Sequence, residues 1–247
     1  MSSPWVLLHG FLGAPSSFDA LVEHLPEGRR VVRPIFVGHR GAPSEATRWD
    51  AEVARIADAI LREAGPGAHL VGYSMGARVA LSLLARHPEL ECEGATLVGG
   101  RLPPHGAERE ARRARDEDLA KRLETESLEA FVDDWEALPL FSTQRALPLS
   151  LREKRRRERL MHDPRGLAAC LRTLGLACMP DLRDELGDVL VPVTLAVGER
   201  DEAFLDHAEE LLAHLPRARL VTFEGAGHDL TLERPAELAA ILTEDEA

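Results

Sequence analysis

The chain has 247 residues, of which 45% are hydrophobic and 29% are charged, and its formal net charge at pH 7 is -12. This length suffices for one domain with a substantial core, and the composition carries no signature of disorder. The acidic balance argues against nucleic acid as a partner, because phosphate binding needs a concentrated cationic surface.

Several features of the sequence bear on where the protein works. No apolar run approaches the roughly 20 residues that cross a bilayer, and residues 1–5 lack the pattern of a signal peptide. The three cysteines, Cys92, Cys170 and Cys178, are an odd number without a close pair, so we expect packing residues rather than disulfides or a zinc site. We therefore expect a cytoplasmic protein without a membrane partner, with a monomer slightly favoured.

Short apolar runs alternate with amphipathic segments in both terminal parts of the chain, which is typical of a parallel sheet with helices on its faces. The runs are nearly continuous rather than alternating, as in strands that are buried on both faces. The predicted strands are Trp5–Leu8, Val31–Phe36, Ala68–Gly72, Ala95–Val98, Val191–Val197 and Arg219–Phe223. The predicted helices among them are Ala51–Ala64, Gly76–His87, Ala203–His214 and Ala236–Leu242.

The alternation stops between residues 102 and 186, where helix-forming residues are interrupted by prolines and no convincing strand occurs. We interpret residues 101–186 as a helical cap inserted after the strand that ends near Val98. Residues 1–100 and 187–247 would then form the α/β core. Because ligands in such folds bind at the carboxyl ends of the strands, the cap would cover the site.

Within the predicted cap, residues 101–165 are the one locally cationic stretch. Residues 101–165 contain 15 Lys and Arg against 14 Asp and Glu, whereas the rest of the chain contains 15 against 28. We interpret most of these arginines as a solvated helical surface.

The most specific local motif is Gly72-Tyr73-Ser74-Met75-Gly76, a G-x-S-x-G sequence between an apolar strand and a helix. The glycines permit a sharp turn that lifts the serine hydroxyl above the sheet, and the helix directs its positive end to the same place. This context predicts that Ser74 is a catalytic residue. It also predicts the α/β-hydrolase fold, a mostly parallel sheet flanked by helices.

A serine hydroxyl needs an imidazole to take its proton, and the imidazole needs a carboxylate to hold its tautomer. Asp201 follows the fifth predicted strand and His228 follows the sixth, in the order serine, acid, histidine that this fold uses. Glu199 is a nearby alternative, but Asp201 lies further into the loop. We predict Ser74, Asp201 and His228 as the catalytic residues.

The segment His9-Gly10-Phe11 follows the first strand, where this fold supplies backbone N–H groups to a developing oxyanion. We predict that the N–H groups of Phe11 and Met75 form the oxyanion hole. A structural role for the His9 imidazole is compatible with this prediction. Neither a metal nor a cofactor is expected.

A narrower resemblance comes from segments on both sides of the motif. These are GYSMGARVA at 72–80, FVDDWEALPLF at 131–141 and LRTLGL at 171–176, with GERDEAF at 198–204 and AGH at 226–228. The chain resembles, nearly end to end, the 2-succinyl-6-hydroxy-2,4-cyclohexadiene-1-carboxylate synthase family of menaquinone biosynthesis. The segment FVDDW is the most specific part, because it lies in the insertion rather than in shared fold elements.

This resemblance implies a lyase that eliminates pyruvate from a small tricarboxylate, 2-succinyl-5-enolpyruvyl-6-hydroxy-3-cyclohexene-1-carboxylate. It implies that the serine abstracts a ring proton with help from the histidine and aspartate, and that arginines bind the substrate's carboxylates. Guanidinium suits that task because it binds carboxylate in a two-pronged geometry. The implied substrate-binding residues are Tyr73, Arg78, Arg112, Trp135 and Arg159, with Arg113, Arg156 and Arg157 as alternatives to the two cap arginines.

Two other functions remain open at this point. The same serine, acid and histidine would serve a carboxylic-ester or thioester hydrolase that acts through an acyl-enzyme. A catalytically silent ligand-binding protein is the third alternative, although the complete set of residues argues against it. The stretch Arg101–Pro104 is interpreted as an ordinary loop that carries no information on substrate.

Overall fold

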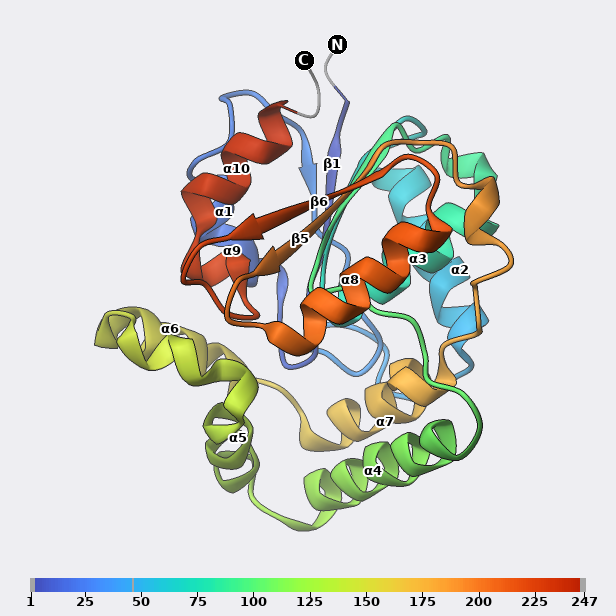
Figure 1. Ribbon diagram of the computed structural model, residues 1–247. Helices are drawn as coiled ribbons and strands as arrows, with labels where there is room; N and C mark the ends of the chain where they lie inside the picture. The colour runs from blue at the N-terminus through green and yellow to red at the C-terminus, as the bar shows by residue number, and fades with distance from the viewer. Residues whose placement is uncertain (1–2, 46, 245–247) are drawn as a thin grey trace.

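A computed structural model describes residues 3–45 and 47–244 and contains a six-stranded sheet, shown in Figure 1. Every pair of neighbouring strands is parallel, and their order is β2-β1-β3-β4-β5-β6. The strands are β1 Trp5–Leu8, β2 Val31–Val32, β3 His69–Tyr73, β4 Gly94–Val98, β5 Val193–Gly198 and β6 Ala218–Phe223. The predicted fold class, a parallel sheet flanked by helices, is confirmed.

Two strands are shorter than predicted, and proline explains both. β2 pairs only at Val31 and Val32 instead of continuing to Phe36. Pro34 lacks the N–H group that a further ladder bond would need, so the chain leaves the sheet before it. β5 begins at Val193 rather than Val191 for the same reason, because Pro192 lies between them.

The sheet is covered on both faces. Val6 and Leu8 of β1 contact one apolar cluster, whereas Trp5 and Leu7 contact the opposite one. Helices α2, α3 and α8 contribute to the first cluster, and α1 and α10 contribute to the second (Figure 1). Burial on both faces explains why the strands are apolar at nearly every position. The bounds are α1 Asp19–Val22, α2 Trp49–Glu63, α3 Met75–Arg86, α8 Glu202–His214, α9 Leu230–Glu233 and α10 Pro235–Glu244, with 3-10 turns η1 Pro15–Phe18 and η2 Pro88–Leu90.

Between β4 and β5 the described chain forms helices and no strand, and Figure 1 shows these helices gathered on one side of the core. Leu12 joins an apolar cluster within them, so they lie over the end of β1. Cys170 and Leu174 of α7, however, pack into the same apolar cluster as Val6 and Leu8 of β1. The division into core and cap at residues 101–186 therefore stays a prediction. The elements are α4 Gly106–Thr125, α5 Leu128–Ala137, η3 Pro139–Ala146, α6 Leu149–Arg159, α7 Pro164–Leu174, η4 Leu176–Cys178 and η5 Leu186–Asp188.

Membrane crossing requires a long apolar helix. Within residues 3–45 and 47–244, every helix falls short of the length and apolarity that such a span needs.

Three buried histidines from separate segments meet where the cap joins the core. The ring centroids of His9 and His39 are 4.6 Å apart, and those of His39 and His162 are 5.1 Å apart. Burial lowers the pKa of His9 and of His162 to about 4, and lowers that of His39 well below 6.5. All three imidazoles are therefore neutral in the folded protein at neutral pH.

The contact between the loop after β2 and helix α7 can be tested with two glycines of similar backbone conformation. Gly38 has φ +75°, and a Cβ there would lie 1.8 Å from the carbonyl oxygen of Gly166. Gly28 has φ +77°, but a Cβ there meets nothing within 4 Å. We expect Gly28→Ala to lower the free energy of unfolding by about 1–2 kcal/mol through backbone strain. Gly38→Ala should lower it by a further ~1–3 kcal/mol through overpacking. Urea denaturation measures both, and equal losses would contradict the close approach of α7.

The buried histidines predict a loss of stability in acid. Free histidine titrates near pH 6.5 whereas folded His162 titrates near 4, so the unfolded chain binds more protons between these values. The stabilising contribution is complete above about pH 7 and is lost progressively as the pH falls towards 4.

The variant His162→Asn tests this contribution, because it keeps an acceptor for the N–H of Arg40. It should reduce the slope of unfolding free energy against pH by up to about 1.4 kcal/mol per unit. Urea denaturation at several pH values tests this, with His24→Asn as the control at an exposed position. An unchanged slope in His162→Asn would count against a neutral buried imidazole.

Candidate active site

Ser74 lies in a strained turn between β3 and α3. Its backbone has φ +53° and ψ -105°, a conformation that residues other than glycine rarely adopt. The flanking glycines make the turn sterically feasible. A Cβ on Gly72 would lie 2.6 Å from the Cα of Ala77, and one on Gly76 would lie 1.9 Å from the carbonyl oxygen of Leu8. The motif is therefore needed to bring the serine to the end of the sheet.

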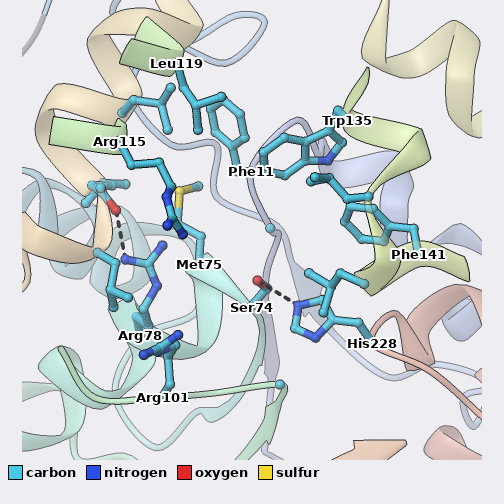
Figure 2. Close-up of a pocket in the computed structure, with 18 of the residues that line it drawn as sticks. Phe11, Ser74, Met75, Arg78, Arg101, Arg115, Leu119, Trp135, Phe141 and His228 are labelled. Atoms are coloured by element: carbon cyan, nitrogen blue, oxygen red, sulfur yellow. Dashed lines mark hydrogen bonds between the residues drawn. The ribbon is translucent and has the colours of Figure 1, made fainter. Parts of the chain in front are cut away.

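The serine, histidine and aspartate predicted from the sequence meet in one hydrogen-bonded chain. His228 Nδ1 is 2.7 Å from Asp201 Oδ2, and His228 Nε2 is 3.1 Å from Ser74 Oγ; Figure 2 shows the second bond. A carboxylate can only accept, so Nδ1 donates the proton and Nε2 is left to accept from the hydroxyl. The histidine and aspartate are 2% and 6% exposed, so bulk water does not compete for these bonds. The arrangement can move a proton between Ser74 and His228.

Glu199, the alternative acid, has a different partner. Its Oε2 accepts a hydrogen bond from the backbone N–H of Gly225 at 2.8 Å, and the residue is exposed. It thus anchors the loop that carries the histidine without contacting the imidazole.

Residues around the imidazole leave little free space. Gly99 has φ +58°, and a Cβ there would lie 2.6 Å from His228 Cε1. The ring centroids of Phe204, Tyr73 and Phe141 lie 4.4, 5.4 and 6.3 Å from that of His228. Sequence reasoning did not assign Phe204 or Phe141 to the site, although both stand in the segments that carry the family resemblance. These contacts hold the imidazole in one orientation.

Met75 and Phe11 supply the two backbone N–H groups that the sequence predicts for an oxyanion hole, and that role stays a prediction. Met75 is the first residue of α3, so its N–H has no acceptor within the helix. Phe11 lies in a turn closed by the hydrogen bond from Gly13 N–H to the carbonyl oxygen of Gly10, at 3.0 Å. Both residues line the same cavity. The His9 ring contacts the Gly10 carbonyl oxygen through Nδ1 at 2.8 Å, so it holds this loop.

A cavity of about 400 Å³ opens above Ser74 and His228, between the core and the cap. Figure 2 shows two different walls. Trp135 and Phe141 lie on the side of His228, and the guanidinium groups of Arg78, Arg101 and Arg115 lie on the opposite side. Tyr73 also lines the cavity, and burial raises the pKa of its hydroxyl well above 10. A ligand would therefore lie between an aromatic and a cationic surface.

Two of the three arginines implied by the family resemblance line this cavity. Arg78 is 9% exposed and donates to the carbonyl oxygen of Leu174 at 3.0 Å. Burial, with a smaller contribution from the charge of Arg112, lowers the pKa of Arg78 to about 9. Arg112 itself forms an ion pair with Asp116, with Nε and Oδ1 2.8 Å apart.

The third implied arginine, Arg159, is not among the residues that line the cavity, and its role in substrate binding stays a prediction. Its Nη1 lies 2.7 Å from Glu136 Oε1 in a neighbouring hollow of about 260 Å³, and Phe141 lines both spaces. A carboxylate stabilises a guanidinium that is 7% exposed, and Glu136 of α5 supplies one to Arg159. The alternatives Arg113, Arg156 and Arg157 also lie outside the lining of the larger cavity.

Three further arginines of the lining were not predicted. Arg101, interpreted from sequence as an ordinary loop residue, lines the cavity together with Arg115 and Arg122. Two signals could have identified them. Arg101 follows the end of β4, where residues of a parallel sheet face the site. Arg115 is three residues beyond Arg112, so both lie on one face of α4.

Comparison with known proteins gives the chain its family. The model of the alpha/beta hydrolase family matches residues 5–241. A putative 2-succinyl-6-hydroxy-2,4-cyclohexadiene-1-carboxylate synthase of Bacillus subtilis is 34% identical, over 97% of this chain and 88% of the relative. A pimeloyl-[acyl-carrier protein] methyl ester esterase of Aromatoleum aromaticum is 32% identical, over 97% of this chain and 96% of the relative. The solved structure of MenH from S. aureus superimposes with a TM-score of 0.92 at 28% identity, over 98% of this chain and 92% of that one.

These relatives include both a synthase and an esterase, so identity alone does not choose the reaction. The match over nearly the whole length, with the parallel sheet and the serine turn after β3, leads to one conclusion. The chain belongs to the α/β-hydrolase family.

Proposed function

We propose that this protein is a lyase that eliminates pyruvate from 2-succinyl-5-enolpyruvyl-6-hydroxy-3-cyclohexene-1-carboxylate in menaquinone biosynthesis. The observation that carries the proposal is one cavity that joins the Ser74, His228 and Asp201 chain to a wall of guanidinium groups. A small substrate with several carboxylates needs such fixed cations. The synthases among the relatives support the same reaction.

The chemistry follows from substrate and product. The substrate has one ring double bond at carbon 3, and the product has two, at carbons 2 and 4. A base removes the proton from carbon 2, which is acidic because it lies next to the succinyl carbonyl. The electron pair shifts around the ring and breaks the bond from carbon 5 to the enolpyruvyl oxygen. The enolpyruvate that leaves takes up a proton and becomes pyruvate, so the step needs no oxidant, metal or water.

The residues of the site fit this sequence of proton transfers. Ser74 Oγ takes the ring proton while its own proton passes to His228 Nε2, and Asp201 stabilises the imidazolium that forms. The N–H groups of Phe11 and Met75 would stabilise the enolate oxygen of the succinyl carbonyl. The imidazolium can then return a proton to the leaving group.

The aromatic wall has a role beside that of the cations. Trp135 and Phe141 cover the cavity on the side of the imidazole. By excluding water they strengthen the electrostatic interactions within the site. The same exclusion disfavours hydrolysis, which distinguishes the proposed lyase from its hydrolase relatives.

A carboxylic-ester or thioester hydrolase is the second candidate, because the serine, histidine and aspartate chain serves either reaction. The esterase of Aromatoleum aromaticum among the relatives favours it. The cationic wall favours the lyase, since a neutral ester carries no charge to compensate that of an unpaired guanidinium.

We also propose the cytoplasm as the location. Cys92, Cys170 and Cys178 are free thiols, and Cys170 Sγ packs 3.7 Å from Met75 Sδ beside the site. Free thiols suit a reducing compartment.

The reaction can be tested directly with the purified protein and the authentic precursor, in an assay coupled to lactate dehydrogenase. We expect pyruvate to form in equal amount with the conjugated diene. Ser74→Ala should lower kcat by at least about 10³-fold, because the proton acceptor is lost. If the protein instead releases a burst of p-nitrophenol from simple esters and forms no pyruvate, the hydrolase is correct.

The role of the carboxylate can be tested with a matched pair of variants. Asp201→Asn removes the charge that stabilises the imidazolium and should lower kcat by about 10²–10⁴-fold. Glu199→Gln changes a residue two positions away that does not contact His228, and kcat should stay within about threefold. Steady-state kinetics gives both values, and the reverse order of effects would assign the acid to Glu199.

A further inference from the structure

The cationic wall of the cavity is built from three elements. Arg78 comes from α3, Arg101 from the segment after β4, and Arg115 from α4. Figure 2 shows the three guanidinium groups together, facing the space above Ser74. Residues from separate parts of the chain thus converge on one side of the cavity.

The charges of the lining are unbalanced. Five arginines line the cavity, against Asp134 as its acidic residue. Two of the five are neutralised locally: Arg112 pairs with Asp116 at 2.8 Å, and Arg122 pairs with Asp134 at 2.5 Å. Within the described part of the chain, the other three, Arg78, Arg101 and Arg115, form no ion pair.

The surroundings of two of these arginines, Arg78 and Arg101, make the imbalance costly, whereas Arg115 is exposed to solvent. Arg78 is nine-tenths buried, and its guanidinium meets a carbonyl oxygen and the ring of Trp49, at 5.8 Å from the ring centroid, but no carboxylate. The Nε of Arg101 is buried without a hydrogen-bond partner. Burial, and then the charge of Arg112, lowers the pKa of Arg101 to about 10. Such groups destabilise the empty protein unless an anion binds to them.

We infer that Arg101 and Arg115, with Arg78, form the surface that binds the substrate's carboxylates and selects a tricarboxylate over ligands with fewer charges. Three unpaired guanidinium groups match three carboxylates in number. Arg159 is not part of this surface, because Glu136 already holds its charge in the neighbouring hollow. The inference rests on the proposed function for the identity of the substrate, whereas the preference for a polyanion rests on the cavity alone.

The position of the surface also orients the ligand. Carboxylates held at the arginines leave the ring beside Trp135 and Phe141, within reach of Ser74. Arg101 and Arg115 act in binding and hold no proton of the reaction. Their loss should therefore weaken binding more than it slows the chemical step.

Direct binding tests the inference without any catalysis. Tricarballylate, a compact tricarboxylate, and its uncharged triamide are titrated by calorimetry into the wild-type protein and into Arg101→Gln and Arg115→Gln. We expect the wild type to bind the tricarboxylate and not the triamide. Each variant should raise Kd by about tenfold or more, because a charge-assisted contact is lost. Arg113→Gln, two residues from Arg115 on α4 but outside the cavity lining, should bind as the wild type does.

Kinetics with the authentic precursor separates binding from chemistry. Arg101→Gln and Arg115→Gln should raise KM about tenfold or more with kcat changed only severalfold, the pattern of lost uniform binding. Arg101→Lys should recover part of the effect, because it restores the charge without the two-pronged geometry. Thermal unfolding of each variant shows whether its fold is retained.

The outcomes distinguish this inference from the proposed function. If no pyruvate forms but the tricarboxylate binds and both variants weaken it, the function is wrong and the binding surface stands. If the wild type binds tricarboxylate and triamide equally, or if Arg101→Gln and Arg115→Gln bind as tightly as Arg113→Gln, the inference is overturned.

Discussion

The structure depends on one steric constraint, the turn that places Ser74 at positive φ between β3 and α3. Gly72 and Gly76 permit it because their hydrogens lie where a Cβ would meet backbone. Once the serine is at the end of the sheet, parallel pairing brings the ends of β5 and β6 to the same edge. A hydrogen bond can then join Ser74 and His228, which are 154 residues apart in the sequence.

This constraint explains why the centre of the site was predictable. The serine motif is local, and the aspartate and histidine each follow an apolar run that sequence identifies as a strand. Parallel strands share one carboxyl edge, so the strand ends meet there without knowledge of the loops. The choice between Asp201 and Glu199 was harder, because both follow β5 in the same loop. The sequence did not show that Glu199 accepts a hydrogen bond from Gly225 rather than contacting His228. Only coordinates distinguish two acids that are two residues apart.

The cap was less predictable because two of its helices, α4 and α6, are polar around much of their surface. In α6, Arg155 and Arg159 are buried while Arg152 and Arg157 are exposed. Residues 152–159 are all arginine, lysine or glutamate, so they give no apolar face that would orient the helix. The direction of Arg159 is set by Glu136, a partner 23 residues away on another helix. Arg101 was missed for a different reason: a short segment after a strand has no periodicity at all. For both arginines, tertiary packing determines the direction of the side chain, and the local sequence pattern does not.

The same hydrogen-bonded chain can serve hydrolysis or elimination, so the walls of the cavity must decide which bond lies beside Ser74. Hydrolysis places a carbonyl carbon there and admits water afterwards. Elimination needs an acidic C–H group at that point and no water, and fixed cations can impose this by holding carboxylates at a distance from the serine. The buried, unpaired guanidinium groups of Arg78 and Arg101 destabilise the empty site, and an anion that binds to them offsets that cost. In the proposed lyase, the binding energy would be tied to charge at one end of the ligand, which would orient the ring for proton abstraction at the other end.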